Sequence, residues 1–148
     1  MKEKIKNVQI FCDGSCKGNP GPGGWAAILK YKEHKKVISG FSPEATNNIM
    51  ELTAVIRALE KIKEKCNVDV FTDSRYVMMG MTEWIENWKK KGWKSSQKKP
   101  VKNKELWKQL DELCSHHYVN WNWVKGHNGH PENEECDTLA KKEIEKNI

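Results

Sequence analysis

Alternating apolar and polar residues predict the strands of this chain. In the first stretch Val8, Ile10 and Cys12 alternate with Gln9, Phe11 and Asp13, as expected when the side chains of a strand point to opposite faces. We expect this strand to end at Asp13, because the following run GSCKGNPGPGG is rich in glycine and proline. Four more strands are predicted over residues 25–32, 36–41, 68–72 and 118–124. A turn at 33–35 makes the first three strands an antiparallel meander that ends at Ser42-Pro43.

Helical periodicity accounts for most of the remaining chain. A long helix is predicted over about 48–65, with Val55, Ala58, Leu59 and Ile62 on one stripe. Shorter helices are predicted over 74–79, with a break at Gly80, and over about 82–90, with Thr82 as its cap. Asn103 is expected to cap a helix that runs to about 114, and Pro131 to open a final helix. This order predicts an α/β fold: a five-stranded mixed sheet, three antiparallel strands plus two parallel, flanked by helices.

Composition indicates the number of domains and the cellular location without identifying a function. The chain shows neither internal repeats nor an interdomain linker, so residues 1–148 are expected to form a single domain. No apolar run approaches the roughly 20 residues of a membrane span, and MKEKIKN is not followed by the apolar segment of a signal peptide. The five cysteines are odd in number and lack a CxxC pair, which favours a reducing, cytoplasmic location over a disulfide framework or zinc site.

Positive charge is concentrated in one segment. The net charge is +6, but residues 89–104 hold eight lysines and no acid, and the remainder is slightly acidic. Such a run is often only a solvated face. Here Trp84, Trp88, Trp93 and Trp107 flank or interrupt it, and aromatic rings mixed with lysines suit a nucleic-acid backbone.

Four acidic residues stand out by position. Asp13 and Asp73 each follow a phenylalanine by two residues at a predicted strand end, and parallel neighbours would bring both to one sheet edge. Glu51 lies in the first turn of the long helix, and Asp137 lies on the final helix. Each also has a structural interpretation: turn formation for the aspartates at the strand ends, a capping box of Asn48 and Glu51, and an ion pair of Asp137 with Lys141.

Together the four acids fit one chemistry. Converging carboxylates repel one another unless cations neutralise them, and oxygen ligands select hard cations, chiefly Mg²⁺ or Mn²⁺. Two such ions can activate water and stabilise the leaving oxygen of a phosphoryl displacement.

Five motifs, in order over about residues 7–142, resemble those of bacterial type 1 ribonuclease H. They are FCDGSC with GNPGPGG, TNNxMEL, TDSxYV, WKKxGW, and WVKGHxGHPEN followed by Asp137. The resemblance implies a ribonuclease H-like fold and an endoribonuclease that hydrolyses the RNA strand of RNA–DNA hybrids by two-metal-ion cleavage. It implies two Mg²⁺ ions, with Mn²⁺ possible, when substrate is bound, and we expect the chain to act as a monomer without membrane contact.

The resemblance also implies roles for individual residues. Asp13, Glu51, Asp73 and Asp137 resemble the metal-binding catalytic quartet, and His127 resembles the histidine that assists proton transfer and product departure. Asn19, Asn47 and Asn48 resemble contacts to the RNA strand and its 2′-hydroxyls. Residues that resemble contacts to the DNA strand, partly within a basic protrusion at about 81–104, are Thr46, Asn103, Trp84, Trp88, Lys89, Lys90, Lys91 and Trp93.

Some alternatives remain open at this point. The asparagines also suit turns and caps, and Trp84 and Trp88 also suit packing of their helix. Thr46 and Asn103 resemble a pocket that grips a phosphate of the DNA strand. Glu44 stands two residues before Thr46, where several family members carry arginine, so its charge is expected to weaken the grip on DNA. A non-catalytic hybrid-binding module with a decayed site and a DNA nuclease of the same fold are the rival functions. The four acids with His127 argue against the first, and the three asparagines with the tryptophan-rich basic segment argue against the second.

Overall fold

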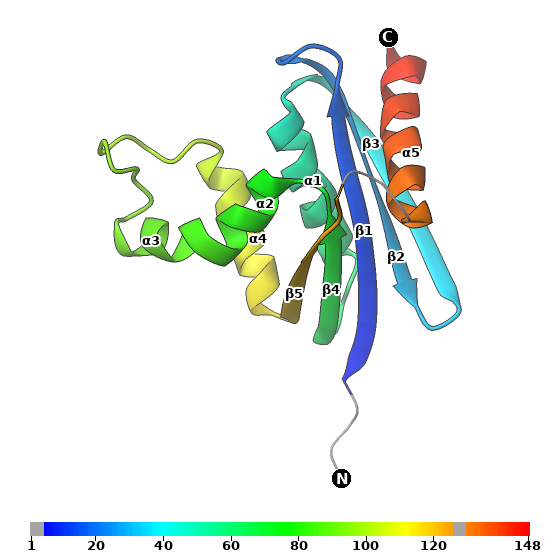
Figure 1. Cartoon of the computed structure of the whole chain (residues 1–148), viewed down its shortest axis with the longest axis horizontal. Helices are drawn as coiled ribbons and strands as arrows, with labels where there is room; N and C mark the ends of the chain where they lie inside the picture. The colour runs from blue at the N-terminus through cyan, green and yellow to red at the C-terminus, as the bar shows by residue number, and fades with distance from the viewer. Residues whose placement is uncertain (1–4, 126–129) are drawn as a thin grey trace.

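A five-stranded sheet with helices on both faces forms the body of the protein (Figure 1). The computed structural model describes residues 5–125 and 130–148. The strands lie in the order β3-β2-β1-β4-β5. β1 pairs antiparallel with β2, and β2 with β3, whereas β1–β4 and β4–β5 are parallel. This confirms the predicted mixed sheet, whose strands are β1 (Lys6–Cys16), β2 (Gly21–Tyr31), β3 (His34–Ala45), β4 (Cys66–Thr72) and β5 (Tyr118–Trp123).

The helices divide between the two faces of the sheet. α1 (Asn47–Glu60) packs on β1 and β2 from one side, and α5 (Pro131–Asn147) crosses β1, β2 and β3 on the other (Figure 1). The rest form a lobe beside β5 and comprise α2 (Arg75–Met79), a π-helical turn (Gly80–Trp84), α3 (Ile85–Lys90) and α4 (Lys104–Ser115). Within the described ranges, none of these helices combines the length and apolar character needed to span a bilayer.

The alternation of β1 serves two cores. Val8, Ile10 and Cys12 enter the main core with the apolar face of α1. Phe11 points to the other face, where Cys136 and Ala140 of α5 cover it. Burying both faces of β1 makes it the rigid centre of the sheet.

The glycine-rich run is part of the sheet, so the prediction that the first strand ends at Asp13 is wrong. β1 continues to Cys16, and Gly24 and Gly23 of β2 pair with Ser15 and Cys16. Close packing explains why glycine is required here: a Cβ on Gly24 would lie 2.1 Å from the carbonyl oxygen of Ala140. The third strand likewise passes through Pro43 to Ala45, which an edge strand tolerates.

The long helix begins at Asn47, as predicted to within one residue, but its capping residue and its end differ from the prediction. It ends at Glu60 rather than near residue 65. Its N-cap is Thr46, whose hydroxyl oxygen accepts a hydrogen bond from the backbone N–H of Ile49 at 3.1 Å. The predicted capping box of Asn48 and Glu51 is therefore wrong, because Asn48 is already inside the first helical turn.

The predicted break at Gly80 is also wrong. Residues 75–90 run on without interruption through the π-helical turn, and the hydroxyl of Thr82 donates to the carbonyl of Met78 at 2.7 Å instead of capping a new helix. Gly80 is buried against Trp107 of α4. Asn103 precedes α4 as predicted, but its side-chain amide donates to the Tyr76 hydroxyl instead of capping the helix.

An aromatic cluster holds the lobe together. The ring centroid of Trp107 lies 5.1 Å from that of Tyr76 and 5.2 Å from that of Trp88, and its indole N–H donates to the Tyr76 hydroxyl. Trp84 and Trp93 pack at the margins of the cluster. Packing is therefore one role of Trp84, Trp88 and Trp93, whereas their contact with DNA stays a prediction.

We predict that Gly80→Ala destabilises the protein, although alanine is the better helix former. Its Cβ would lie 2.0 Å from Cη2 of Trp107, and overpacking of this kind costs about 1–3 kcal/mol. Urea denaturation should show the loss. Thr82→Ala, on the exposed side of the same segment, is the control and should change the free energy of unfolding by much less. A gain in stability for Gly80→Ala would contradict the packing account.

Candidate active site

Three carboxylates from three elements meet at one edge of the sheet. Asp13 lies on β1, Glu51 on α1, and Asp73 directly after β4. One ligand oxygen from each lies within 4.8 Å of the other two. Asp13 is only 4% exposed, and the other two side chains are half-buried.

The register of the sheet explains how the two aspartates meet. β1 and β4 run parallel with Phe11 opposite Phe71, whose rings stack at 4.9 Å between centroids. Asp13 and Asp73 each lie two residues beyond this pair. The shared Phe-x-Asp spacing therefore places both carboxylates at the same end of adjacent strands, as the sequence predicts.

Glu51 reaches the aspartates because Gly14 has no side chain. A Cβ on Gly14 would lie 2.5 Å from the carbonyl carbon of Met50 and 2.6 Å from the nitrogen of Glu51. The first turn of α1 can therefore press against β1 directly beside Asp13.

Burial dominates the electrostatics of this group. Burial and the charge of Asp73 raise the pKa of Asp13 to about 7. Burial and the charge of Asp13 likewise raise the pKa of Glu51 well above its ordinary value. The N–H of Gly14 donates to Oδ1 of Asp13 at 2.9 Å. Among the residues that the structure describes, no donor meets the buried Oδ2 of Asp13 or the buried Oε2 of Glu51.

These oxygens fit a hard divalent cation. A buried carboxylate oxygen without a donor is costly, and a cation would satisfy it while cancelling the mutual repulsion. The donor set consists of carboxylates alone, which suits Mg²⁺ or Mn²⁺ better than a softer metal. The residues present therefore fit the metal that the sequence predicts.

Asp137 lies at the margin of this group. Its Oδ2 accepts from Lys141 at 3.1 Å, so the predicted ion pair is present. It is not one of the three residues whose oxygens converge within 4.8 Å. Its charge nevertheless raises the pKa of Asp13, which places it in the same electrostatic environment.

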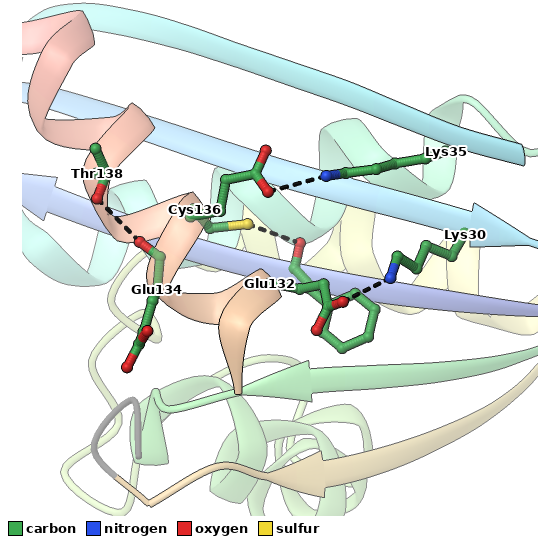
Figure 2. A network of polar contacts seen from close by, with 8 residues as sticks. Lys30, Lys35, Glu132, Glu134, Cys136 and Thr138 are labelled. Atoms are coloured by element: carbon green, nitrogen blue, oxygen red, sulfur yellow. Dashed lines mark hydrogen bonds and ion pairs between the residues drawn. The ribbon is translucent and has the colours of Figure 1, made fainter. Parts of the chain in front are cut away.

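Several contacts fix the helix that carries Asp137. Figure 2 shows Lys30 and Lys35 reaching from the sheet toward α5. Lys30 pairs with Glu132, and Lys35 pairs with Glu135. The thiol of Cys136 donates to the backbone carbonyl of Phe11 at 3.4 Å. The side chain of Asn133 is buried and donates to the carbonyl of Phe71. α5 is thus tied to both β1 and β4, next to the strand ends that carry Asp13 and Asp73.

The predicted RNA contacts lie around the start of α1. Oδ1 of Asn19 accepts from the backbone N–H of Asn47 at 3.2 Å, which joins the loop between β1 and β2 to the helix that carries Glu51. Asn19, Asn47 and Asn48 are all exposed. The predicted proton-transfer residue His127 lies outside the described residues.

The predicted DNA contacts lie on α1 and in the lobe. The Thr46 hydroxyl caps α1, and exposed Glu44 lies two residues before it. Nζ of Lys89 lies 3.4 Å from Oδ2 of Asp111 and 3.9 Å from Oε1 of Glu86, so the positive charge of Lys89 is partly compensated. Lys90 and Lys91 are exposed and have no ion-pair partner in the described part of the chain.

The sequence did not predict that Trp123 and Arg75 lie next to Asp73. The indole N–H of Trp123 donates to the backbone carbonyl of Asp73 at 3.4 Å, and the Arg75 guanidinium lies 5.1 Å from the Trp123 ring centroid. Only the parallel pairing of β4 with β5 brings Trp123 there. Asn133, too, has no local sequence signal for its buried position.

The pKa of Asp13 leads to a prediction about stability without metal. A carboxyl group whose pKa rises from 3.8 to about 7 on folding binds protons more tightly in the folded state. Its stabilising contribution is therefore lost as the pH rises through about 7. Asp13→Asn should raise the free energy of unfolding by up to about 4 kcal/mol at about pH 8, and by little at about pH 4.

Urea denaturation with a chelator at both pH values would measure this difference. Glu145→Gln, an exposed carboxylate on α5, is the control and should be neutral at both. A gain for Asp13→Asn that is equal at the two pH values would show that the buried charge is not its cause.

The family model, the similar sequences and the similar structures all point to the same family. The RNase H family model matches residues 5–145. A ribonuclease H of Enterobacter sp. (strain 638) is 60% identical over 136 residues, which cover 92% of this chain and 88% of that protein. One from Citrobacter koseri is 59% identical over 137 residues, with 93% and 88% coverage. LC9-RNase H1, described as a type 1 RNase H with the type 2 active-site motif, has a similar structure with a TM-score of 0.88 and 31% identity, over all of this chain and 76% of its own. This chain belongs to the RNase H family.

Proposed function

We propose that this chain is an endonuclease that hydrolyses the RNA strand of RNA–DNA hybrids with divalent metal ions at Asp13, Glu51, Asp73 and Asp137. The observation that carries the proposal is the convergence of three carboxylates within 4.8 Å, two of them with buried oxygens that lack a donor. Family membership and the name ribonuclease H of relatives about 60% identical support the substrate.

Each acidic residue has its own part in this proposal. Asp13, Glu51 and Asp73 hold the metal, and Asp137 adds a fourth carboxylate from α5. Two bound Mg²⁺ or Mn²⁺ ions would supply an activated water and stabilise the leaving oxygen of the RNA phosphodiester. Asp137 accepts from Lys141 through Oδ2, and we propose its Oδ1 for that role.

The remaining site residues are proposed to contact either the RNA strand or the DNA strand of the hybrid. Asn19, Asn47 and Asn48 lie exposed at the start of the helix that carries Glu51, where amide groups can read the 2′-hydroxyls of the cut strand. His127 is proposed to carry the proton that the reaction moves. The basic protrusion at 81–104, together with Thr46 and Asn103, is proposed to hold the DNA strand.

The cellular location and the oligomeric state form part of the same proposal. We place the enzyme in the cytoplasm as a single-domain monomer. The five cysteines are all free thiols, as expected in a reducing compartment. A non-catalytic hybrid-binding module is disfavoured, because binding alone gives no reason to bury Asp13 and Glu51 side by side.

Cleavage of a labelled RNA–DNA hybrid, beside matched RNA and DNA duplexes, tests the proposal. Cleavage should be specific for the RNA of the hybrid, require Mg²⁺ or Mn²⁺, and stop with a chelator. Asp13→Asn should reduce kcat by about 10²–10³-fold, since it removes a charge that faces the metal. Hybrid binding should remain within a few-fold of that of the unaltered protein.

Glu145→Gln makes the same carboxylate-to-amide change at an exposed position on α5 and should cleave normally. Near-full activity of purified Asp13→Asn would rule out the proposed metal site. Metal-dependent cutting of the DNA duplex at a similar rate would instead favour a DNA nuclease.

The basic protrusion leads to a second prediction. Lys90→Ala/Lys91→Ala should flatten the dependence of log K on log salt for hybrid binding, by about 0.7–0.9 for each phosphate that the protein no longer neutralises. KM should rise with little change in kcat. Lys108→Ala/Lys142→Ala, which removes two exposed lysines from α4 and α5, is the control. An unchanged slope for the first variant would mean that the protrusion is a solubility surface.

A further inference from the structure

Trp123 ends β5 and contacts the segment that carries Asp73. β5 pairs with β4 in parallel register, and Thr72, the last residue of β4, lies opposite Trp123. The indole N–H of Trp123 donates to the backbone carbonyl of Asp73 at 3.4 Å. Asp73 follows the last residue of β4. The side chain of Trp123 therefore reaches past the end of the ladder to a residue that lies beyond it.

The backbone is also held on both sides of Asp73. The N–H of Val124 donates to the carbonyl of Thr72 at 2.8 Å. The N–H of Ser74 donates to the Thr72 hydroxyl at 3.0 Å, and the Ser74 hydroxyl accepts from the N–H of Val77, which caps α2. Thr72 and Ser74 are both buried. These bonds fix the chain before and after Asp73, whereas the longer indole bond acts on Asp73 itself.

Packing in the core does not account for the indole of Trp123. Val119 and Trp121, which share its face of β5, pack against the main core. Trp123 is 42% exposed at the end of this edge strand. The Arg75 guanidinium lies 5.1 Å from its ring centroid, within the range of a cation–π contact. The indole therefore contacts the turn between β4 and α2 at two places, Asp73 and Arg75.

Asp73 differs from the other two converging carboxylates in how its backbone is held. Asp13 lies within β1 and Glu51 within α1, so the regular hydrogen bonds of a strand or a helix hold each of them. Asp73 lies between β4 and α2. Because ligand oxygens of the three residues lie within 4.8 Å of one another, their repulsion favours displacement of the residue that lies outside a regular element.

A hollow beside Trp123 gives the stacked arginine a purpose. α2 packs against β5 (Figure 1), and a hollow of about 330 Å³ lies between them. The residues that line it are Arg75, Met78, Met79, Thr82, Glu83 and Trp123. Without the guanidinium on its ring, the indole would have room to turn into this hollow and release the carbonyl of Asp73.

We propose that Trp123 is a positioning residue for the metal site: its hydrogen bond to the Asp73 backbone, with Arg75 stacked on its ring, holds the Asp73 carboxylate near Asp13 and Glu51. The inference rests on the metal site of the proposed function. It requires no contact of Trp123 with the metal or with the hybrid. Loss of the indole should therefore weaken metal binding and leave hybrid binding nearly unchanged.

Binding of Mn²⁺, followed by the loss of the electron paramagnetic resonance signal of the free ion, tests this role without substrate. Trp123→Phe keeps a ring for Arg75 but has no N–H donor. It should weaken Mn²⁺ binding about two- to ten-fold, as expected for the loss of one neutral hydrogen bond. Trp123→Leu also loses the stack with Arg75 and should weaken binding further.

Cleavage of the hybrid gives a second measurement. For both Trp123 variants, kcat should fall at low Mn²⁺ concentration and recover with excess Mn²⁺. KM for the hybrid should stay within about two-fold of that of the unaltered protein. A loss of folding stability alone would not produce this separation, because it would not change the metal affinity of the folded protein.

Tyr118 supplies matched controls at the start of the same strand. It is an exposed aromatic residue, and Nζ of Lys65 lies 4.6 Å from its ring centroid. Tyr118→Phe and Tyr118→Leu should leave Mn²⁺ binding and kcat within about two-fold. Urea denaturation of Tyr118→Leu and Trp123→Leu would show how much stability each change costs.

Unchanged Mn²⁺ binding by both Trp123 variants would overturn the positioning role. A higher KM for the hybrid with unchanged Mn²⁺ binding would also overturn it and would make Trp123 a contact to the hybrid. Asp13→Asn separates this failure from that of the proposed function. If Asp13→Asn bound Mn²⁺ as well as the unaltered protein, both proposals would fail. If only Asp13→Asn lost Mn²⁺ binding, the positioning role alone would fail.

Discussion

Repulsion among buried carboxylates is the constraint on which the rest of this structure depends. Asp13, Glu51 and Asp73 present oxygens within 4.8 Å of one another, and burial raises the pKa of the first two. Such a cluster would spread apart unless each member were held by its own scaffold. β1, α1 and β4 supply that scaffold through apolar contacts in the main core.

The charges of the molecule are separated in space. The three converging carboxylates lie at one end of the sheet, and six lysines line a pocket between the start of β1 and the end of α1. This separation keeps the lysines of the pocket from neutralising the acidic group.

The sequence predicts the sheet and the meeting of Asp13 with Asp73 because both depend on local patterns. Alternation marks β1 and β4, and the Phe-x-Asp spacing follows from their parallel register. Some of the incorrect predictions concern contacts between segments distant in the chain. Gly24 lies inside β2, where it pairs with Ser15, and the close approach of Ala140 leaves no room for a side chain there.

The start of α1 and the course of the lobe show two further limits. Thr46, Asn47 and Asn48 are consecutive residues that can all cap a helix, so sequence alone does not decide among them. Gly80 lies within a continuous helical segment and packs against Trp107 of another element, a contact that the local sequence does not reveal. The residues at the margin of the site could not be predicted from the sequence either. Asn133 and Trp123 join the site only through the packing of α5 and β5.

The π-helical turn constrains the number of residues in the helical segment of the lobe. Tyr76, Gly80, Trp84 and Trp88 recur every four residues, and three of them touch Trp107. In a regular α-helix each four-residue step overshoots one turn by about 40°, whereas the wider π turn takes up an extra residue. Inserting or deleting one residue here would rotate all that follows by about 100°, carrying Lys90 and Lys91 to another flank. The length of this segment is therefore constrained as tightly as the side chains that contact Trp107.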